Sequence, residues 1–102
     1  MSSRPGTYFI TANAAGKRNL FQSERMGSLF LEIIRRYRTQ GKYLLHEYTL
    51  MPNHCHLLLT TAEGTSLAKA AQFIKGGYSF EAGKMLGSKA EIWRAGLETI
   101  AF

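Results

Sequence analysis

The sequence lacks several features that would point to particular kinds of protein or chemistry. Its 102 residues include a single cysteine, Cys55, so a disulfide framework is impossible and a cysteine-based zinc site lacks ligands. All seven acidic residues are glutamate, so any carboxylate chemistry must use a glutamate. No apolar run approaches the roughly 20 residues of a membrane span, and the N-terminus lacks the apolar segment of a signal peptide. We therefore expect one cytoplasmic domain with no membrane partner.

Positive charge is present in excess and is unevenly distributed. The net charge is +6; residues 1–42 hold eight Lys and Arg against two Glu, whereas residues 43–102 hold five of each. This asymmetry suits a polyanion such as nucleic acid, although a solvated basic surface with no specific partner explains it equally well. In the predicted loop 13–19, Lys17 and Arg18 could contact DNA phosphates or could simply be solvated.

The clearest predicted element is an amphipathic helix that follows Ser23, a good N-cap residue, and closes near Gly41. Its apolar positions recur at helical spacing: Met26, Leu29, Phe30, Ile33, Ile34 and Tyr37. β-Branched and aromatic residues predict a first strand over residues 7–11. Two further strands, 43–51 and 54–61, are joined by a short turn and should form an antiparallel hairpin.

After the hairpin we predict a second helix, capped by Thr65 or Ser66 and stopped by the glycine pair 76–77. A short third helix is expected over 79–86 and a fourth strand over 91–95. The resulting order, strand–helix–strand–strand–helix–strand, predicts a ferredoxin-like α+β fold. In that fold an antiparallel sheet carries its helices packed on one face.

The third predicted strand carries the residues with the clearest chemistry. Side chains two apart on a strand share a face, so His54 and His56 should project together while Cys55 points into the core. Two neutral imidazoles can hold one metal ion, but strand histidines at this spacing often bind nothing. We interpret His46 as a sheet-surface residue, so a third ligand would come from elsewhere.

The residues around these histidines form a recognisable pattern. Residues 48–59 (YTLMPNHCHLLL) resemble the signature of the IS200-like Y1 transposases, which are HUH single-strand DNA transposases, and are most similar to the REP-associated tyrosine transposase branch. That signature is a hydrophobic strand, then Met-Pro-Asn-His-U-His and leucines, and Cys55 fills the hydrophobic U position. Weaker similarities follow in order at residues 8–11, 19–21, 66–76 and 92–93. The resemblance thus predicts a single HUH/Y1 domain over residues 1–102.

The resemblance implies a DNA transposase that nicks and rejoins single-stranded DNA. His54 and His56 would bind Mg²⁺ or Mn²⁺, which polarises the scissile phosphate. A tyrosine would attack the phosphorus, leaving a 5′-phosphotyrosine and a free 3′-OH. The resemblance also implies a homodimer, a single-stranded or hairpin DNA partner, and a cytoplasmic, nucleoid-associated location. Lys75 could contact a phosphate or merely complement a helix dipole.

The nucleophile is the incomplete part of the pattern. In the family the tyrosine lies on a helix beyond the segment that matches Trp93, and we expect that C-terminal helix to be lacking from residues 1–102. Tyr78, the only tyrosine after the histidines, is a candidate nucleophile, with core packing as the alternative. Two other hypotheses stay open. One is a catalytically inactive DNA-binding remnant; the other is a ferredoxin-like RNA-binding module, although the RNP1-type aromatic string is missing.

Overall fold

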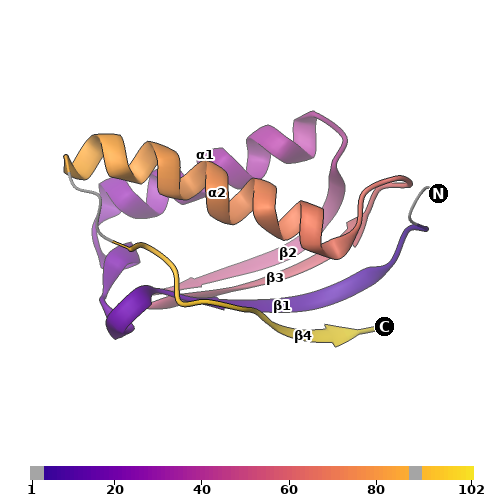
Figure 1. Cartoon of the computed structure of the whole chain (residues 1–102), viewed down its shortest axis with the longest axis horizontal. Coiled ribbons are helices and arrows are strands. Elements are labelled where there is room, and N and C mark those ends of the chain that lie inside the picture. The colour runs from indigo at the N-terminus through magenta and orange to yellow at the C-terminus, as the bar shows by residue number, and fades with distance from the viewer. Residues whose placement is uncertain (1–3, 88–90) are drawn as a thin grey trace.

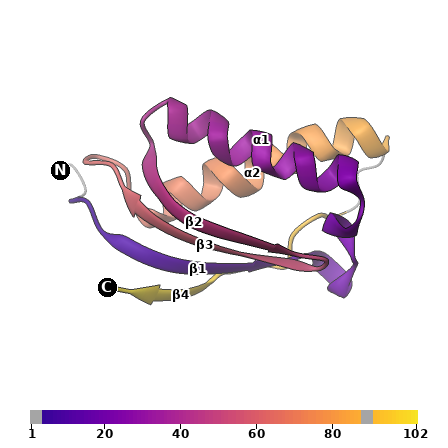
Figure 2. The ribbon, with the colours of Figure 1, turned by 180° about the vertical axis from the view of Figure 1, so that it is seen from behind.

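The computed structural model describes residues 4–87 and 91–102, which form a four-stranded antiparallel sheet with two helices on one face (Figure 1). In chain order the elements are β1 (Thr7–Asn13), the 3-10 turns η1 (Ala15–Lys17) and η2 (Leu20–Gln22), α1 (Glu24–Thr39), β2 (Tyr43–Met51), β3 (His54–Thr61), α2 (Leu67–Leu86) and β4 (Glu98–Ala101). The strand order is β2-β3-β1-β4, so the predicted ferredoxin-like α+β fold is confirmed. Seen from front and back, both α-helices of the described residues lie on one face of the sheet and leave the other face open (Figures 1 and 2).

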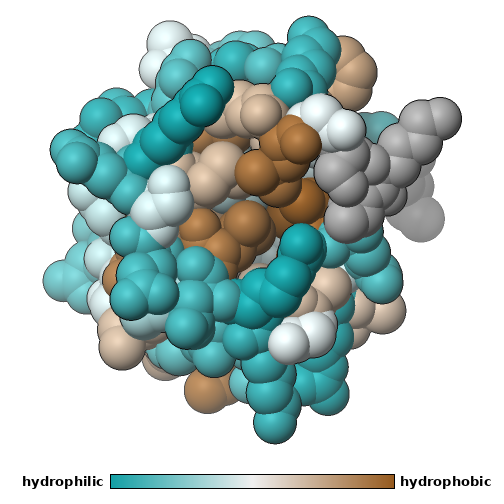
Figure 3. All heavy atoms as spheres, turned by 90° about the vertical axis from the view of Figure 1, so that its left-hand side faces the viewer, coloured by the Kyte–Doolittle hydropathy of each residue, from teal (hydrophilic) through white to brown (hydrophobic). Residues whose placement is uncertain are grey.

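The core lies between the helices and one face of the sheet. On β3 burial alternates strictly from His54 to Thr61, because every second side chain points toward the helices. The apolar stripe of α1 covers that face, as its spacing predicts, and Phe30, Ile33 and Ile34 have no exposed surface. Figure 3 views the end of the molecule on the left of Figure 1, where apolar side chains show through a ring of hydrophilic ones. The helices cover one face of the sheet, and Thr11, His54 and His56 lie on the other, open face.

Helix α1 begins as predicted. The backbone N–H of Met26 donates to the Ser23 hydroxyl at 3.4 Å, which satisfies one of the free donors of the first turn. Beyond the helix, Gly41 adopts a left-handed φ of 78°, so the chain turns there into β2.

Helix α2 differs from the sequence prediction. It runs without a break from Leu67 to Leu86, so the predicted stop at the glycine pair and the separate helix over 79–86 are wrong. The reason is packing: a Cβ on Gly77 would lie 2.9 Å from the Tyr37 ring, so glycine lets α1 and α2 approach closely. Neither α1 nor α2, the two α-helices of residues 4–87 and 91–102, combines the length and the apolar character that a membrane span needs.

The two glycines of α2 should respond in opposite ways to a methyl group. Gly76 faces open space, so Gly76→Ala should stabilise the protein by about 1 kcal/mol through helix propensity. At Gly77 the added methyl group meets the Tyr37 ring, so Gly77→Ala should gain nothing or lose stability. Urea denaturation of the two variants tests this difference. Equal stabilisation by both would show that the helix contact does not require glycine.

The fourth strand also lies further along the chain than predicted. Residues 91–95 form no strand; β4 spans Glu98–Ala101 and pairs with β1. Trp93 instead makes an isolated bridge to Ala14, is 6% exposed, and donates from its indole N–H to the Lys75 carbonyl at 3.1 Å. The apolar residues that suggested a strand are therefore used to pack this segment against α2.

Candidate metal and DNA site

His54 and His56 lie side by side on the open face of the sheet. Their ring centroids are 4.9 Å apart and both side chains are half-buried. In the register, His54 stands between Asn13 of β1 and Met51 of β2, while His56 lies opposite Thr11 of β1. The strand alternation thus places the two imidazoles together, as the sequence predicts.

Each imidazole is held by a hydrogen bond at the same ring nitrogen. Nδ1 of His54 lies 2.7 Å from Oδ1 of Asn53, and Nδ1 of His56 lies 2.9 Å from Oγ1 of Thr11. An amide oxygen can only accept, so His54 donates from Nδ1, and in the neutral ring Nε2 is then the nitrogen with the lone pair. Metal-binding histidines show this arrangement: one nitrogen is oriented by a polar neighbour and the other is free to ligate. The asparagine of the Met-Pro-Asn-His block therefore has a physical role.

Cys55 points to the opposite side of the strand. It is 1% exposed and belongs to the core. Burial raises the pKa of its thiol to about 12, so at neutral pH it carries its proton and is neither a nucleophile nor a ready metal ligand. The middle residue of the triplet is a packing residue.

Among the residues that the structure describes, no third His, Cys, Asp or Glu joins the histidine pair. Within 4–87 and 91–102, no group of three His, Cys, Asp or Glu side chains could hold a metal ion. His46 lies on β2, where its Nε2 is 2.7 Å from the Thr60 hydroxyl. The pair can therefore supply two nitrogen ligands, and any others must come from elsewhere.

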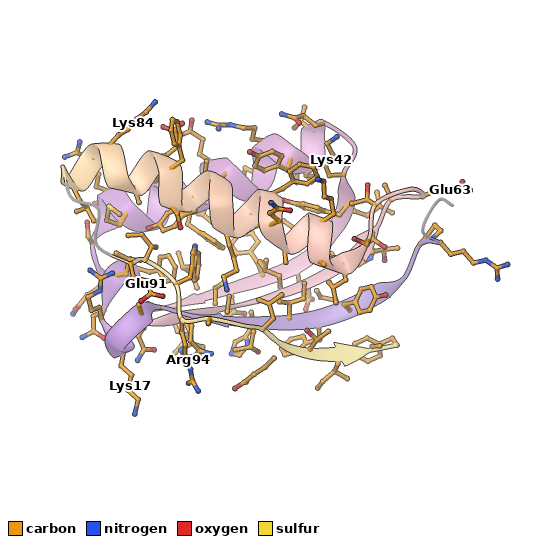
Figure 4. All side chains as sticks on the ribbon, in the orientation of Figure 1. Lys17, Lys42, Glu63, Lys84, Glu91 and Arg94 are labelled. Carbon is orange, nitrogen blue, oxygen red and sulfur yellow. The ribbon has the colours of Figure 1, made fainter. Side chains whose placement is uncertain are left out.

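A basic hollow of about 740 Å³ adjoins His54. It is lined by Asn13, Ala14, Gly16, Lys17, Asn53, His54 and Arg94. Lys17 and Arg94 project on the side of the sheet away from the helices (Figure 4). The two cations give the hollow the charge that a phosphate requires.

Arg94 was not predicted to be a site residue. Its backbone N–H donates to the Asn13 carbonyl at 2.9 Å, next to the bridge between Ala14 and Trp93, so β1 and the segment before β4 come together there. Because this contact joins residues about 80 positions apart, the sequence carries only a weak signal of it, a basic residue directly after Trp93.

The other two predicted phosphate contacts are already engaged within the protein. The Arg18 guanidinium donates to the backbone carbonyls of Glu91 and Ala15. Nζ of Lys75 donates to the carbonyls of Arg94 and Gly96, at 3.1 Å each. Lys75 also lies in the middle of α2, so the helix-dipole alternative does not apply. Contact of these two residues with DNA stays a prediction.

Tyr78 is placed in the core, away from the histidines. It has no exposed surface, its hydroxyl donates to the Met26 carbonyl at 3.1 Å, and burial raises its pKa. Its ring packs against three others: Phe21, Phe30 and Trp93. Tyr78 belongs to the helix layer whereas the imidazoles face the other side of the sheet. The structure therefore does not bring the candidate nucleophile to the candidate metal ligands.

Comparison with known proteins shows the family and the fold of the chain. The family model for "Transposase IS200 like" matches residues 6–97. No curated protein sequence matches the chain. Among solved structures, a REP-associated tyrosine transposase bound to a REP hairpin superposes with a TM-score of 0.75 at 20% identity, over 95% of this chain. A transposase candidate from Deinococcus radiodurans R1 superposes with a TM-score of 0.79 at 16% identity, over 98% of this chain and 81% of its own. The chain spans 56% of the length of the REP-associated protein.

Proposed function

Because the chain belongs to the IS200-like transposase family, we propose that it is a DNA strand-transfer domain that holds a phosphate of single-stranded or hairpin DNA at His54 and His56. The observation that carries the proposal is the shared orientation of the two imidazoles. Both make a hydrogen bond within the protein at Nδ1, and Nε2 of each ring can ligate an ion in the neutral tautomer that carries its proton on Nδ1. The structural neighbour bound to a REP hairpin supports hairpin DNA as the partner.

The donor set fits a divalent ion that shares its ligands with DNA. His54 and His56 would hold the ion, and phosphate oxygens and water would complete its shell, since such ions often use few protein ligands beside a substrate phosphate. Imidazole nitrogens favour Mn²⁺ over Mg²⁺, which prefers oxygen ligands. When bound, the ion supplies Lewis-acid polarisation of the scissile phosphate. Lys17 and Arg94 would orient the neighbouring phosphate by charge.

Asn53 should act on metal affinity without being a ligand. In Asn53→Ala the His54 ring loses the hydrogen bond that fixes its Nδ1, so Mn²⁺ affinity should fall about 10- to 100-fold. Isothermal titration with Mn²⁺ measures this change. Asn19→Ala, in an exposed position outside the hollow, is the matched control and should bind like the wild type. Unchanged affinity in Asn53→Ala would contradict the orienting role.

Strand cleavage is tested with end-labelled single-stranded and hairpin DNA and Mn²⁺. A covalent protein–DNA adduct on a denaturing gel, lost in His56→Ala, would show that this chain cleaves DNA with a tyrosine that reaches the histidine pair. In the adduct a tyrosine oxygen replaces the 3′ oxygen on phosphorus, so a strand with a free 3′-OH is released. A wild-type protein that binds neither DNA nor Mn²⁺ would contradict the proposed function.

The second candidate function is DNA binding without strand cleavage. The observation that favours it is the burial of Tyr78, whose hydroxyl is committed to the Met26 carbonyl. In that case the same assay gives Mn²⁺-dependent DNA binding without an adduct, and His54→Ala abolishes the metal dependence.

We further propose that the domain acts as a homodimer associated with the nucleoid. The support is the family and the position of β2 at an edge of the sheet, where one side of its backbone pairs with no strand of the described residues. Light scattering on the purified protein tests the oligomeric state.

A further inference from the structure

The open face continues past the histidines into an aromatic surface. Phe9 lies next to His56, with ring centroids 5.3 Å apart and planes inclined by only 18°. His54, His56 and Phe9 thus form a row of three rings, with centroid separations of 4.9 and 5.3 Å. In the register, Phe9 stands between Leu58 of β3 and Ile100 of β4. An aromatic ring on an open sheet face has no packing role toward the helices.

A small hollow opens over this end of the row. It measures about 170 Å³ and is lined by Phe9, Glu47, Tyr48, Thr49, His56, Leu58 and Phe102. Since a water molecule occupies roughly 30 Å³ in the liquid, the space suits one planar ring system. The hollow shares His56 with the candidate metal site.

The two hollows of the open face differ in charge, so each suits a different part of a nucleotide. Lys17 and Arg94 line the one beside His54, which attracts phosphate. Glu47 lines the one beside Phe9, and its carboxylate repels phosphate but can accept a hydrogen bond from the amino group of a base. A protein partner that covered this face would have to bury Glu47 and His56 along with the apolar side chains, which is costly.

We infer that Phe9 is a stacking platform for one unpaired base next to the phosphate held at the histidine pair, and that Glu47 favours a base with an exocyclic amino group. This inference rests on the proposed function and adds a base-recognition site to it. Aromatic side chains bind single-stranded nucleic acid in this way because every base presents a π-face. Glu47 adds a preference for cytosine over thymine, which has no amino group.

The test compares short fluorescent oligonucleotides of deoxycytidine, of thymidine and of abasic sites, by anisotropy in Mn²⁺ buffer. Phe9→Ala should weaken deoxycytidine binding about 5- to 100-fold, and Phe9→Trp should restore it. Binding of the abasic strand should be the same in all three proteins. Phe80→Ala removes a 63% exposed phenylalanine from α2 and should change nothing.

Glu47→Ala should remove the preference for deoxycytidine over thymidine, whereas Glu63→Ala, at an exposed turn, should retain it. Equal affinity of Phe9→Ala and wild type for deoxycytidine would overturn the inference. So would an equal loss of abasic-strand binding, because the ring would then act only through the fold. If His56→Ala still removes Mn²⁺-dependent DNA binding in either case, the proposed function stands without the base site. If the wild type binds no oligonucleotide at all, both fail.

Discussion

Replacing His54 with alanine should lower Mn²⁺ affinity by more than about 100-fold while leaving the fold intact. The loss of a neighbour that orients a metal-bound histidine already costs about 10- to 100-fold, so removal of the ligand itself should cost more. His54 is on the open face and is only half-buried, so the core does not depend on it. Isothermal titration with Mn²⁺ measures the affinity, and circular dichroism checks the fold.

His46→Ala is the matched control for that experiment. His46 is an exposed histidine of the neighbouring strand and is hydrogen-bonded to Thr60, so its loss should leave Mn²⁺ binding unchanged. Equal losses in the His46 and His54 variants would indicate non-specific binding to surface imidazoles. Full affinity in His54→Ala would place the metal elsewhere.

Replacing Tyr78 should destabilise the protein more than any surface substitution. Tyr78→Ala leaves a cavity among three aromatic rings and should lower the free energy of unfolding by about 3–5 kcal/mol. Tyr78→Phe keeps the ring but loses the hydrogen bond to the Met26 carbonyl, so it should cost about 1 kcal/mol. Urea denaturation measures both.

Tyr48→Phe is the control for the hydroxyl, because Tyr48 is 42% exposed on β2 and should be neutral to within about 0.5 kcal/mol. The same variants decide the role of Tyr78 in chemistry. If Tyr78→Phe is as stable as the wild type but forms no DNA adduct where the wild type does, Tyr78 is the nucleophile and the core assignment is contradicted.

The parts of the fold that follow from local patterns could be predicted from the sequence. The apolar stripe of α1 recurs with a single helical period, so the sequence alone shows which side chains of the helix are buried. The alternation of side chains on β3 likewise predicts that His54 and His56 share one face of the sheet and that Cys55 is buried on the other. These features depend on neighbours within a few residues.

The errors arose where a distant contact overrides a local preference. The glycine pair 76–77 reads as a helix stop, but the contact with Tyr37 uses Gly77 for close packing instead. The sequence of residues 91–95 predicts a strand, but Trp93 packs against α2, and the chain pairs with β1 as a strand only from Glu98 onward. Glycine and tryptophan have several structural uses, and only the tertiary partner decides among them.

The candidate site also includes residues outside the histidine motif, and these could not be predicted because their neighbours are distant in the sequence. In β1 apolar residues occupy both faces, so the sequence could not tell that Tyr8 and Ile10 face the helices while Phe9 faces the open side. The neighbours of Phe9 and Arg94 come from strands and segments far along the chain. Register and topology, rather than composition, create the two hollows beside the histidines.

The central claim is that the open sheet face around His54 and His56 binds a divalent ion together with single-stranded DNA. Paramagnetic line broadening tests it most directly: Mn²⁺ is added to ¹⁵N-labelled protein with and without DNA, and the broadened amide signals are mapped. We expect the amide signals of Asn13, His54 and His56 to be broadened most. When DNA is added, the broadening should become confined to residues around this site, while signals of α1 stay narrow. Broadening centred on the 62–65 turn or on the helices, with no effect at the histidine pair, would contradict the claim.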